Sequence, residues 1–262
     1  MDKAFAEITS DREFPVTNKY VGEEVCSRLA YPKEYKKPKP IVEQIKVLAE
    51  IFNLDPSYAL EFAKNLPPHQ SFIPVDALTW VGWFAILCER RNLAAKYFPE
   101  VTDPTRKYYR AVQLVHAKIA DTRTFYVYHE GRDMSAQFRV HARTAYALDR
   151  IVEAQKGDIL IVAAQLGMRH RGRSVRRARE VFATNEFGLG SLAVGSIVLT
   201  HPKRLVRWRE LDMDCAGDEF APNGDDFCKV PGFRVSGRAA KFGMGFVGDP
   251  RDHFGSVTGF LP

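Results

Sequence analysis

The sequence has few cysteines and no long apolar segment. Its four cysteines are scattered and include no C-x-x-C pair, which excludes a disulfide-rich scaffold. The longest apolar run, residues 77–88, has 12 residues, whereas an apolar helix needs about 20 residues to span a bilayer. The first 14 residues carry acidic side chains and lack the apolar core of a secretory signal. We therefore expect a soluble cytoplasmic protein that has no membrane partner.

Signature motifs of the common enzyme classes are missing as well. The chain contains no P-loop, HExxH, GxSxG or protein-kinase pattern. Nothing in the sequence pairs Cys26 or Cys88 with a base, so no nucleophile can be nominated. The sequence therefore leaves open both the catalytic residues and whether the chain is an enzyme at all.

Apolar material for a core is plentiful. Of the 262 residues, 45% are hydrophobic and 12% aromatic, and this length fits one large domain or two small ones. Residues 1–40, with three prolines near their end, are expected to be a loosely structured N-terminal segment and linker. Residues 41–120 have mainly helical periodicity, and residues 121–262 alternate between strand and helix patterns. The last two regions could form one continuous domain.

Individual elements follow from local patterns. Residues 104–120 are predicted to form a helix with Asp103 as its N-cap. Strands are predicted at residues 137–141 and 159–164, with a helix between them that fits a crossover connection. Residues 181–187 have a helical pattern. The predicted class is α+β, with a helical N-terminal half, a mixed-sheet core with at least one crossover helix, and a Gly- and Asp-rich C-terminal part of short strands.

Positive charge is concentrated in one part of the chain. The sequence has 38 Lys and Arg against 32 Asp and Glu, a net charge of +6. Residues 169–209 hold ten basic and two acidic residues, and residues 210–226 hold seven acidic and no basic ones. A basic segment thus runs directly into an acidic one. This junction indicates either a polyanionic partner or pairing between the two segments.

The densest basic feature is a turn between the predicted strand at residues 159–164 and a helix that Ser174 would cap. Six arginines lie within eleven residues, from Arg169 to Arg179. Helix N-termini attract anions, and guanidinium groups bind phosphate in a bidentate manner. We therefore predict that this turn contacts the phosphate backbone of DNA or RNA, or another polyanion, mostly without reading sequence.

A second basic run, HPKRLVRWR at residues 201–209, could extend the same surface, and Trp208 could offer a stacking plane or pack in the core. The predicted nucleic-acid-binding residues are Arg169, Arg171, Arg173, Arg176, Arg177, Arg179, Lys203, Arg204 and Arg207.

Two alternatives use the acidic segment. In the first, the chain is a nuclease-like enzyme that acts on a phosphate-containing substrate and binds Mg²⁺ or Ca²⁺. Its candidate ligands are Asp212, Asp214, Asp218 and Glu219. In the second, the chain is a structural or interaction protein in which the basic and acidic segments pair within one copy or between copies. The main prediction needs no cofactor.

One short stretch, residues 239–249, resembles one line of the RNA-recognition motif. It has matching residues at Gly243, Gly245, Phe246 and Val247, and a methionine, Met244, where that family has an aromatic residue. The match covers eight residues and implies neither a fold nor residue roles. Residues 124–129 (TFYVYH) have the alternating aromatics that such sheets use to stack bases, a pattern that ordinary strands share. The general character is similar to that of accessory proteins of mobile elements, although no diagnostic residue supports this impression.

Overall fold

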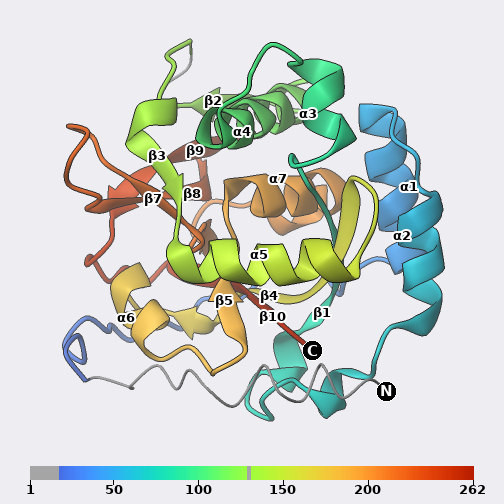
Figure 1. Ribbon diagram of the computed structural model, residues 1–262. Coiled ribbons are helices and arrows are strands. Elements are labelled where there is room, and N and C mark those ends of the chain that lie inside the picture. The colour runs from blue at the N-terminus through green and yellow to red at the C-terminus, as the bar shows by residue number, and fades with distance from the viewer. Residues whose placement is uncertain (1–17, 129–130) are drawn as a thin grey trace.

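A single mixed sheet organises the molecule (Figure 1). The computed structural model describes residues 18–128 and 131–262. Within these ranges, the main path of the ten-stranded sheet is β1 (Gly82–Leu87), β4 (Ile159–Arg171), β10 (Phe254–Phe260), β6 (Asp212–Asp214), β8 (Lys229–Ser236), β7 (Asp218–Phe220) and β3 (Phe138–Val140). Three further strands pair outside this path: β5 (Glu186–Gly188) with β10, β9 (Ala239–Phe246) with β8, and β2 (Phe125–Val127) with β9.

Helix α7 (Ser191–Thr200) lies at the centre, and the sheet curls around it (Figure 1). Its sequence, SLAVGSIVLT, has no polar face, and nine of its ten residues are buried. A helix that is apolar on all sides is stable only when it is covered on all sides. Strand β1 and helices α1 (Ile41–Phe52) and α4 (Pro104–Ala120) pack against it.

The other helices cover the outside. They are α2 (Ser57–Phe62), α3 (Asn92–Tyr97), α5 (Ala142–Ala154) and α6 (Val175–Glu180). Short 3₁₀ turns occur at Ala63–Asn65, His69–Ser71, Leu78–Trp80, Ser135–Gln137 and Pro202–Arg204. One hydrophobic core contains residues from Tyr35 to Val257 and so unites the helical and the strand-rich regions. The fold belongs to the α+β class that the sequence predicts.

Local sequence signals explain several element boundaries. Helix α4 begins at Pro104, and the side chain of Asp103 accepts a hydrogen bond from the backbone N–H of Arg106 at 2.7 Å. Helix α6 begins after Ser174, whose hydroxyl accepts a hydrogen bond from the N–H of Arg177 at 3.0 Å. Helix α5 connects β3 to β4 and is the predicted crossover helix.

Strand β4 is longer than its apolar run because it passes close to β10 at two glycines. Gly167 has φ +107°, a conformation that favours glycine, and a Cβ on Gly255 would lie 2.1 Å from the carbonyl oxygen of Gly167. The pairing register between β4 and β10 shifts at this point. Beyond it, β4 continues to Arg171 and so carries the first arginines of the basic segment on a strand.

Two segments differ from simple expectation, whereas the apolar stretch at residues 76–91 forms a 3₁₀ turn followed by the largely buried strand β1. Residues 181–187, which have a helical pattern, contain instead the beginning of β5, because their backbone pairs with β10. Residues 18–40 contain no helix or strand beyond one bridge, yet they pack against the body, where Tyr31 and Tyr35 form an edge-to-face ring pair with centroids 5.3 Å apart.

Candidate functional site

The arginine-rich turn joins β4 to α6, and part of the N-terminal segment covers it. The backbone N–H of Val25 donates to the carbonyl of Gly172 at 2.8 Å, and the N–H of Ser174 donates to the carbonyl of Glu23 at 3.0 Å. A Cβ on Gly172 would lie 2.3 Å from the Val25 carbonyl oxygen, so only glycine allows this approach. The covering segment brings two glutamates to the arginines.

Three arginines of the turn pair with these glutamates. Arg173 Nε and Arg177 Nε lie 3.4 and 2.6 Å from Oε1 of Glu24, and Arg176 pairs with Glu23. The hydrogen bond from Arg177 lowers the pKa of Glu24, although burial opposes this shift. These guanidinium groups are therefore already neutralised by carboxylates of the same chain.

The remaining arginines of the segment also have internal partners. Arg169 contacts Asp76 at 2.6 Å and Glu186 at 3.2 Å. Arg179 pairs with Glu219 at 3.1 Å and also donates to two backbone carbonyls. Arg171 donates to the carbonyl of Leu29 at 2.9 Å. Of the acidic side chains that pair with these arginines, only Glu219 comes from the acidic segment at residues 210–226. Most of the ion pairing therefore involves acidic residues outside that segment.

The second basic run is divided between core and surface. Arg204 is fully buried and donates to the carbonyls of Leu211 and Leu166, both at 2.7 Å. Arg207 pairs with Glu34. Lys203 is exposed and has no ion pair among the described residues. Among the nine predicted nucleic-acid-binding residues, Lys203 is an exposed cation without an ion pair to a described residue, whereas Arg171 and Arg204 bond to backbone carbonyls.

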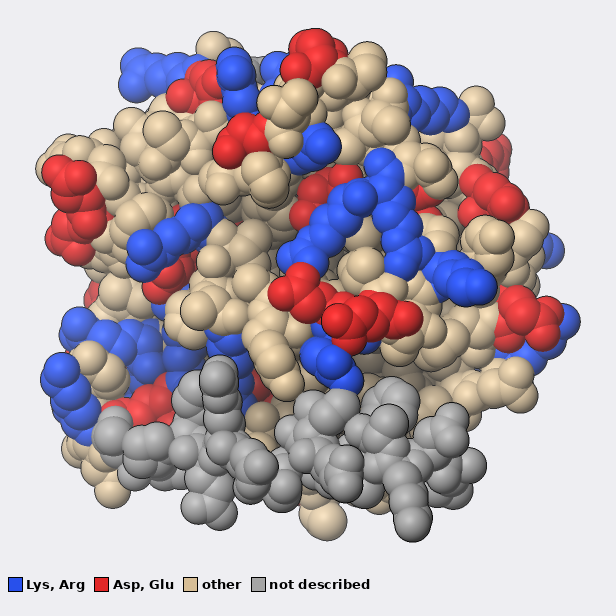
Figure 2. Space-filling model, viewed as in Figure 1, with Lys and Arg blue, Asp and Glu red and all other residues tan. Residues whose placement is uncertain are grey.

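The basic residues consequently do not form one uniform patch on the face seen in Figure 2. There, groups of Lys and Arg lie beside Asp and Glu at several places, and other residues separate them. This mixture agrees with the ion pairs described above.

The four carboxylates that were proposed as metal ligands each form hydrogen bonds or ion pairs with other protein groups. The pairs are Asp212 with the N–H of Val235, Asp214 with Arg251, Asp218 with Tyr108 and Ser191, and Glu219 with Arg139 and Arg179. Burial raises the pKa of Asp212 to about 7 and the pKa values of Asp214 and Asp218 to about 6. In residues 18–128 and 131–262, no group of three or more His, Cys, Asp or Glu side chains could hold a metal ion.

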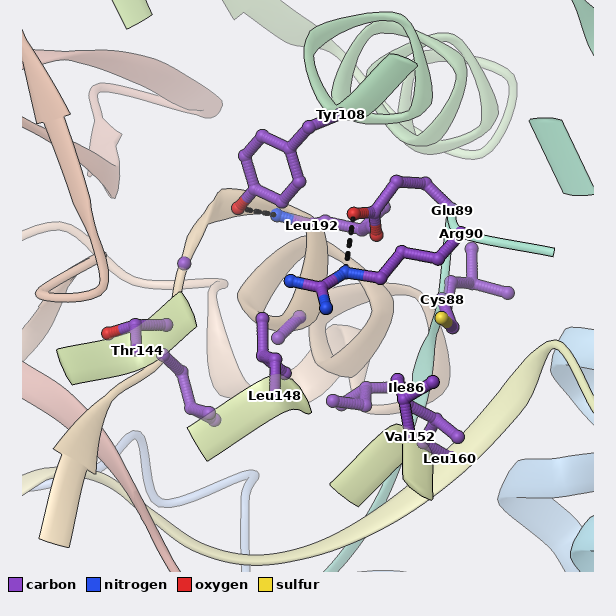
Figure 3. A pocket seen from close by; sticks show the side chains of 14 residues that line it. Ile86, Cys88, Glu89, Arg90, Tyr108, Thr144, Leu148, Val152, Leu160 and Leu192 are labelled. Atoms are coloured by element: carbon purple, nitrogen blue, oxygen red, sulfur yellow. Dashed lines mark hydrogen bonds and ion pairs between the residues drawn. The ribbon is translucent and has the colours of Figure 1, made fainter. Parts of the chain in front are cut away.

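A small cavity lies at the N-terminal end of α7 (Figure 3). Tyr108 donates to Asp218 at 2.9 Å and accepts from the backbone N–H of Leu192 at 3.4 Å. Glu89 and Arg90 both line this cavity and form an ion pair with Nε and Oε1 3.5 Å apart, and burial raises the pKa of Glu89. The cavity holds only about 20 Å³, which is room for about one water molecule. The cavity is too small for a substrate. The hydrogen bonds of Tyr108 and Asp218 beside it hold the first residues of α7 in place.

An exposed face of the sheet carries aromatic and basic side chains together. Tyr126 of β2 pairs in register with Lys241 of β9, and Lys241 pairs with Arg234 of β8. Directly paired residues point to the same side of a sheet. Tyr126 exposes 56% of its surface and Tyr128, two residues further along, 75%. We call Tyr126, Tyr128, Arg234 and Lys241 the tyrosine face.

Glycine forms the floor of the tyrosine face. Gly232 of β8 pairs with Gly243 of β9, so no side chain rises between the two strands at this point. A Cβ on Gly243 would lie 3.9 Å from a guanidinium nitrogen of Arg234 and 4.0 Å from the Cβ of Tyr128. Glycine in a strand often marks a place where a ligand approaches the backbone.

Sequence reasoning missed the basic members of this face. The alternation in TFYVYH and the glycines near Gly243 are visible in the sequence, but β2 and β9 are separated by more than 100 residues. Neither Arg234 nor Lys241 forms an ion pair with a described residue. The Nζ of Lys241 lies 5.9 Å from the ring centroid of Tyr126, a cation–π contact.

Comparison with known proteins gives no further indication of the function. No protein-family model, no curated protein and no solved structure matches the chain. Among the described helices, none is both long and apolar enough to cross a membrane.

Proposed function

We propose that the protein binds single-stranded nucleic acid, and that the tyrosine face is the binding surface. Exposed aromatic rings stack on bases of any sequence, and nearby cations attract the phosphates. The observation that carries this proposal is the placement of two exposed tyrosines, Tyr126 in β2 and Tyr128 directly after it, beside Lys241 and Arg234 on adjoining strands. The two tyrosines are separated by about 6.6 Å along the strand, the spacing of alternate residues. Each ring can therefore take a different base.

The tyrosine face is a better candidate than the arginine-rich turn. Binding of a phosphate by Arg176 or Arg177 would compete with the ion pairs to Glu23 and Glu24. Arg234 and Lys241 have no such pairs to lose within the described chain. Binding a phosphate to Arg234 would weaken one longer-range attraction, because Arg234 lies close enough to Asp212 to lower the pKa of that carboxyl group. Burial nevertheless has the larger effect and raises this pKa. The face therefore offers positive charge and stacking surface without breaking an ion pair of Arg234 or Lys241 with a described residue.

Fluorescence polarisation with a labelled oligo-uridine and a labelled oligo-thymidine tests the proposal. Stacking contributes about 1–3 kcal/mol per base, so Tyr126→Ala and Tyr128→Ala should each weaken binding by about 5-fold to 150-fold. Lys241→Ala should weaken binding most at low salt, where the contact between a cation and a phosphate contributes most. It should also reduce the slope of log K against log[salt] by about 0.7, the contribution of one phosphate contact on a single strand.

Two variants serve as controls. Tyr146→Ala removes a tyrosine that is also exposed, at 49%, but lies on α5, and it should leave the affinity unchanged. Lys203→Ala removes an exposed cation of the second basic run that forms no ion pair with a described residue. If Lys203→Ala weakens binding while the two tyrosine variants do not, the binding surface lies at the basic run and the proposal is wrong. The absence of affinity for either oligonucleotide at low salt would also refute it.

A further inference from the structure

A cavity of about 170 Å³ opens between helix α4 and strands β2 and β9. Phe125 and Val127 of β2 line it while Tyr126 between them is exposed, so it lies on the opposite side of β2 from Tyr126. Tyr128, just beyond β2, also borders the cavity. Two alanines of α4, Ala117 and Ala120, line the cavity and are exposed to solvent. Their small side chains leave the cavity accessible from the surface.

The lining is aromatic and uncharged. Phe125, Phe242 and Met244 form the wall on the sheet side, and Gln113 and His116 face them from α4. No described lining residue is acidic or a lysine or arginine. Binding a charged ligand there would remove its hydration without supplying a counter-charge. The cavity therefore favours a neutral molecule.

One polar atom at this site lacks a partner. His116 is 7% exposed, and its Nε2 has no hydrogen-bond partner among the described residues. The imidazole lies against Phe242, with ring centroids 4.2 Å apart, and against Phe125 at 5.4 Å. Burial lowers the pKa of His116 to about 3, so the ring is neutral at pH 7. A neutral imidazole nitrogen can form one hydrogen bond with a ligand, as donor or as acceptor.

We propose that this cavity binds a neutral single-ring aromatic molecule bearing one hydroxyl or amino group, which forms a hydrogen bond with Nε2 of His116. The size supports one ring, because an apolar protein cavity of about 150 Å³ accommodates benzene. The wall of Phe125 and Phe242 allows edge or offset contacts with such a ring. The polar substituent fills the hydrogen bond that His116 lacks. This proposal does not depend on nucleic-acid binding at the tyrosine face.

Titration of the full chain with phenol, toluene and benzoate, followed by protein NMR and by the thermal unfolding midpoint, tests the proposal. Phenol should bind at least five times more tightly than toluene, and benzoate should bind more weakly than both. Shifts in the NMR spectrum on phenol binding should be largest at residues of α4, β2 and β9 and at Tyr128, Gly131 and Met134, which also line the cavity.

Three variants test where and how the ligand binds. Ala117→Leu places a larger side chain at the mouth of the cavity from an exposed helix position, so folding should be kept and phenol binding lost. Ala95→Leu, on an exposed position of α3 outside the cavity, is the matched control and should bind phenol normally. His116→Phe should remove the preference for phenol over toluene.

The outcomes are decisive in both directions. Failure of both phenol and toluene to bind at millimolar concentration overturns the proposal, as does undiminished phenol binding by Ala117→Leu. If His116→Phe keeps the preference for phenol, the hydrogen bond to Nε2 is refuted even though the cavity is occupied. Loss of phenol binding in Ala117→Leu with retention in Ala95→Leu, together with loss of the preference in His116→Phe, supports it.

Discussion

His170 and Glu186 form a hydrogen-bonded pair that is completely buried, with Nε2 and Oε1 2.8 Å apart. The same carboxylate accepts from the hydroxyl of Thr258 at 2.7 Å and lies 3.2 Å from Nε of Arg169. One acidic residue from β5 thus binds the first two basic residues of the arginine-rich segment. These side chains are part of the interior, even though the sequence places them in the most basic stretch of the chain.

Glu186→Gln should destabilise the protein by about 3 kcal/mol at pH 7, because it leaves buried groups without their charged partner. Burial opposes ionisation of Glu186, but His170 and Arg169 together lower its pKa. A carboxylate with a lowered folded-state pKa stabilises above its ordinary value of 4.5 and loses this contribution as pH falls through the folded value. Urea unfolding at several pH values should therefore show the difference from the unmodified chain shrinking below about pH 4.5.

Asp76→Asn is the matched control for this prediction. Asp76 also pairs with Arg169, but its side chain is 71% exposed, and exposed ion pairs contribute at most about 1 kcal/mol. A loss of stability in Asp76→Asn as large as that in Glu186→Gln would show that burial of the pair is not what matters.

Combined replacement of Arg173, Arg176 and Arg177 by alanine should release the segment at residues 18–30 and leave oligonucleotide affinity nearly unchanged. These side chains hold that segment through Glu23 and Glu24. Hydrogen exchange at Val25, whose N–H bonds to Gly172, should become faster. A large loss of affinity with normal exchange at Val25 would instead assign nucleic-acid binding to the turn.

The parts of the fold that depend on neighbouring residues follow from the sequence. Asp103 and Ser174 cap the helices they precede, and the apolar run at residues 159–164 lies in a buried strand. Helix capping and strand burial of this kind depend on the sequence of a few neighbouring residues. The same reasoning fails at residues 181–187, where pairing of β5 with β10 overrides a helical pattern.

The partners of the charged residues could not be read from the sequence. The acidic run at residues 210–226 lies close in sequence to the arginines, but Arg176 and Arg177 pair with glutamates about 150 residues away. Long-range pairing depends on how the whole chain folds back on itself. The tyrosine face poses the same difficulty, because it requires the register between β2 and β9.

Asp212→Asn should stabilise the protein at pH 8 by about 1–3 kcal/mol and have no effect below pH 4. Burial raises the pKa of Asp212 from 3.8 to about 7. The folded state therefore holds this proton more tightly than the unfolded state between these values, so ionisation costs stability as pH rises through the window. Asparagine is neutral, and its carbonyl can still accept the hydrogen bond from Val235. Urea unfolding at pH 4, 6 and 8 measures the effect.

Asp225→Asn, at an exposed position of the same acidic segment, should change stability by less than about 0.5 kcal/mol at every pH. A destabilised Asp212→Asn protein at pH 8 would mean that the charge of Asp212 supports the fold, for example through the buried guanidinium of Arg204, which acts to lower the pKa of Asp212.

Gly243→Val should weaken oligonucleotide binding about tenfold or more without destabilising the protein. A Cβ at this position meets nothing closer than 3.9 Å, and valine suits a strand better than glycine does. Its branched side chain would nevertheless stand between Tyr128 and Arg234 on the floor of the tyrosine face and keep a base away from the rings. Polarisation assays measure the oligonucleotide affinity of Gly243→Val, and urea unfolding of the same preparation measures its stability.

Gly245→Val provides the comparison, because it lies on the same strand but under a side chain. A Cβ there would lie 2.7 Å from a guanidinium nitrogen of Arg251, which bonds to the buried Asp214 at 2.9 Å. This variant should lose stability by about 1–3 kcal/mol as the Arg251–Asp214 contact is displaced. If Gly243→Val binds oligonucleotides as tightly as the unmodified chain while remaining folded, bases do not approach the backbone between β8 and β9. The tyrosine face would then have to act without its glycine floor.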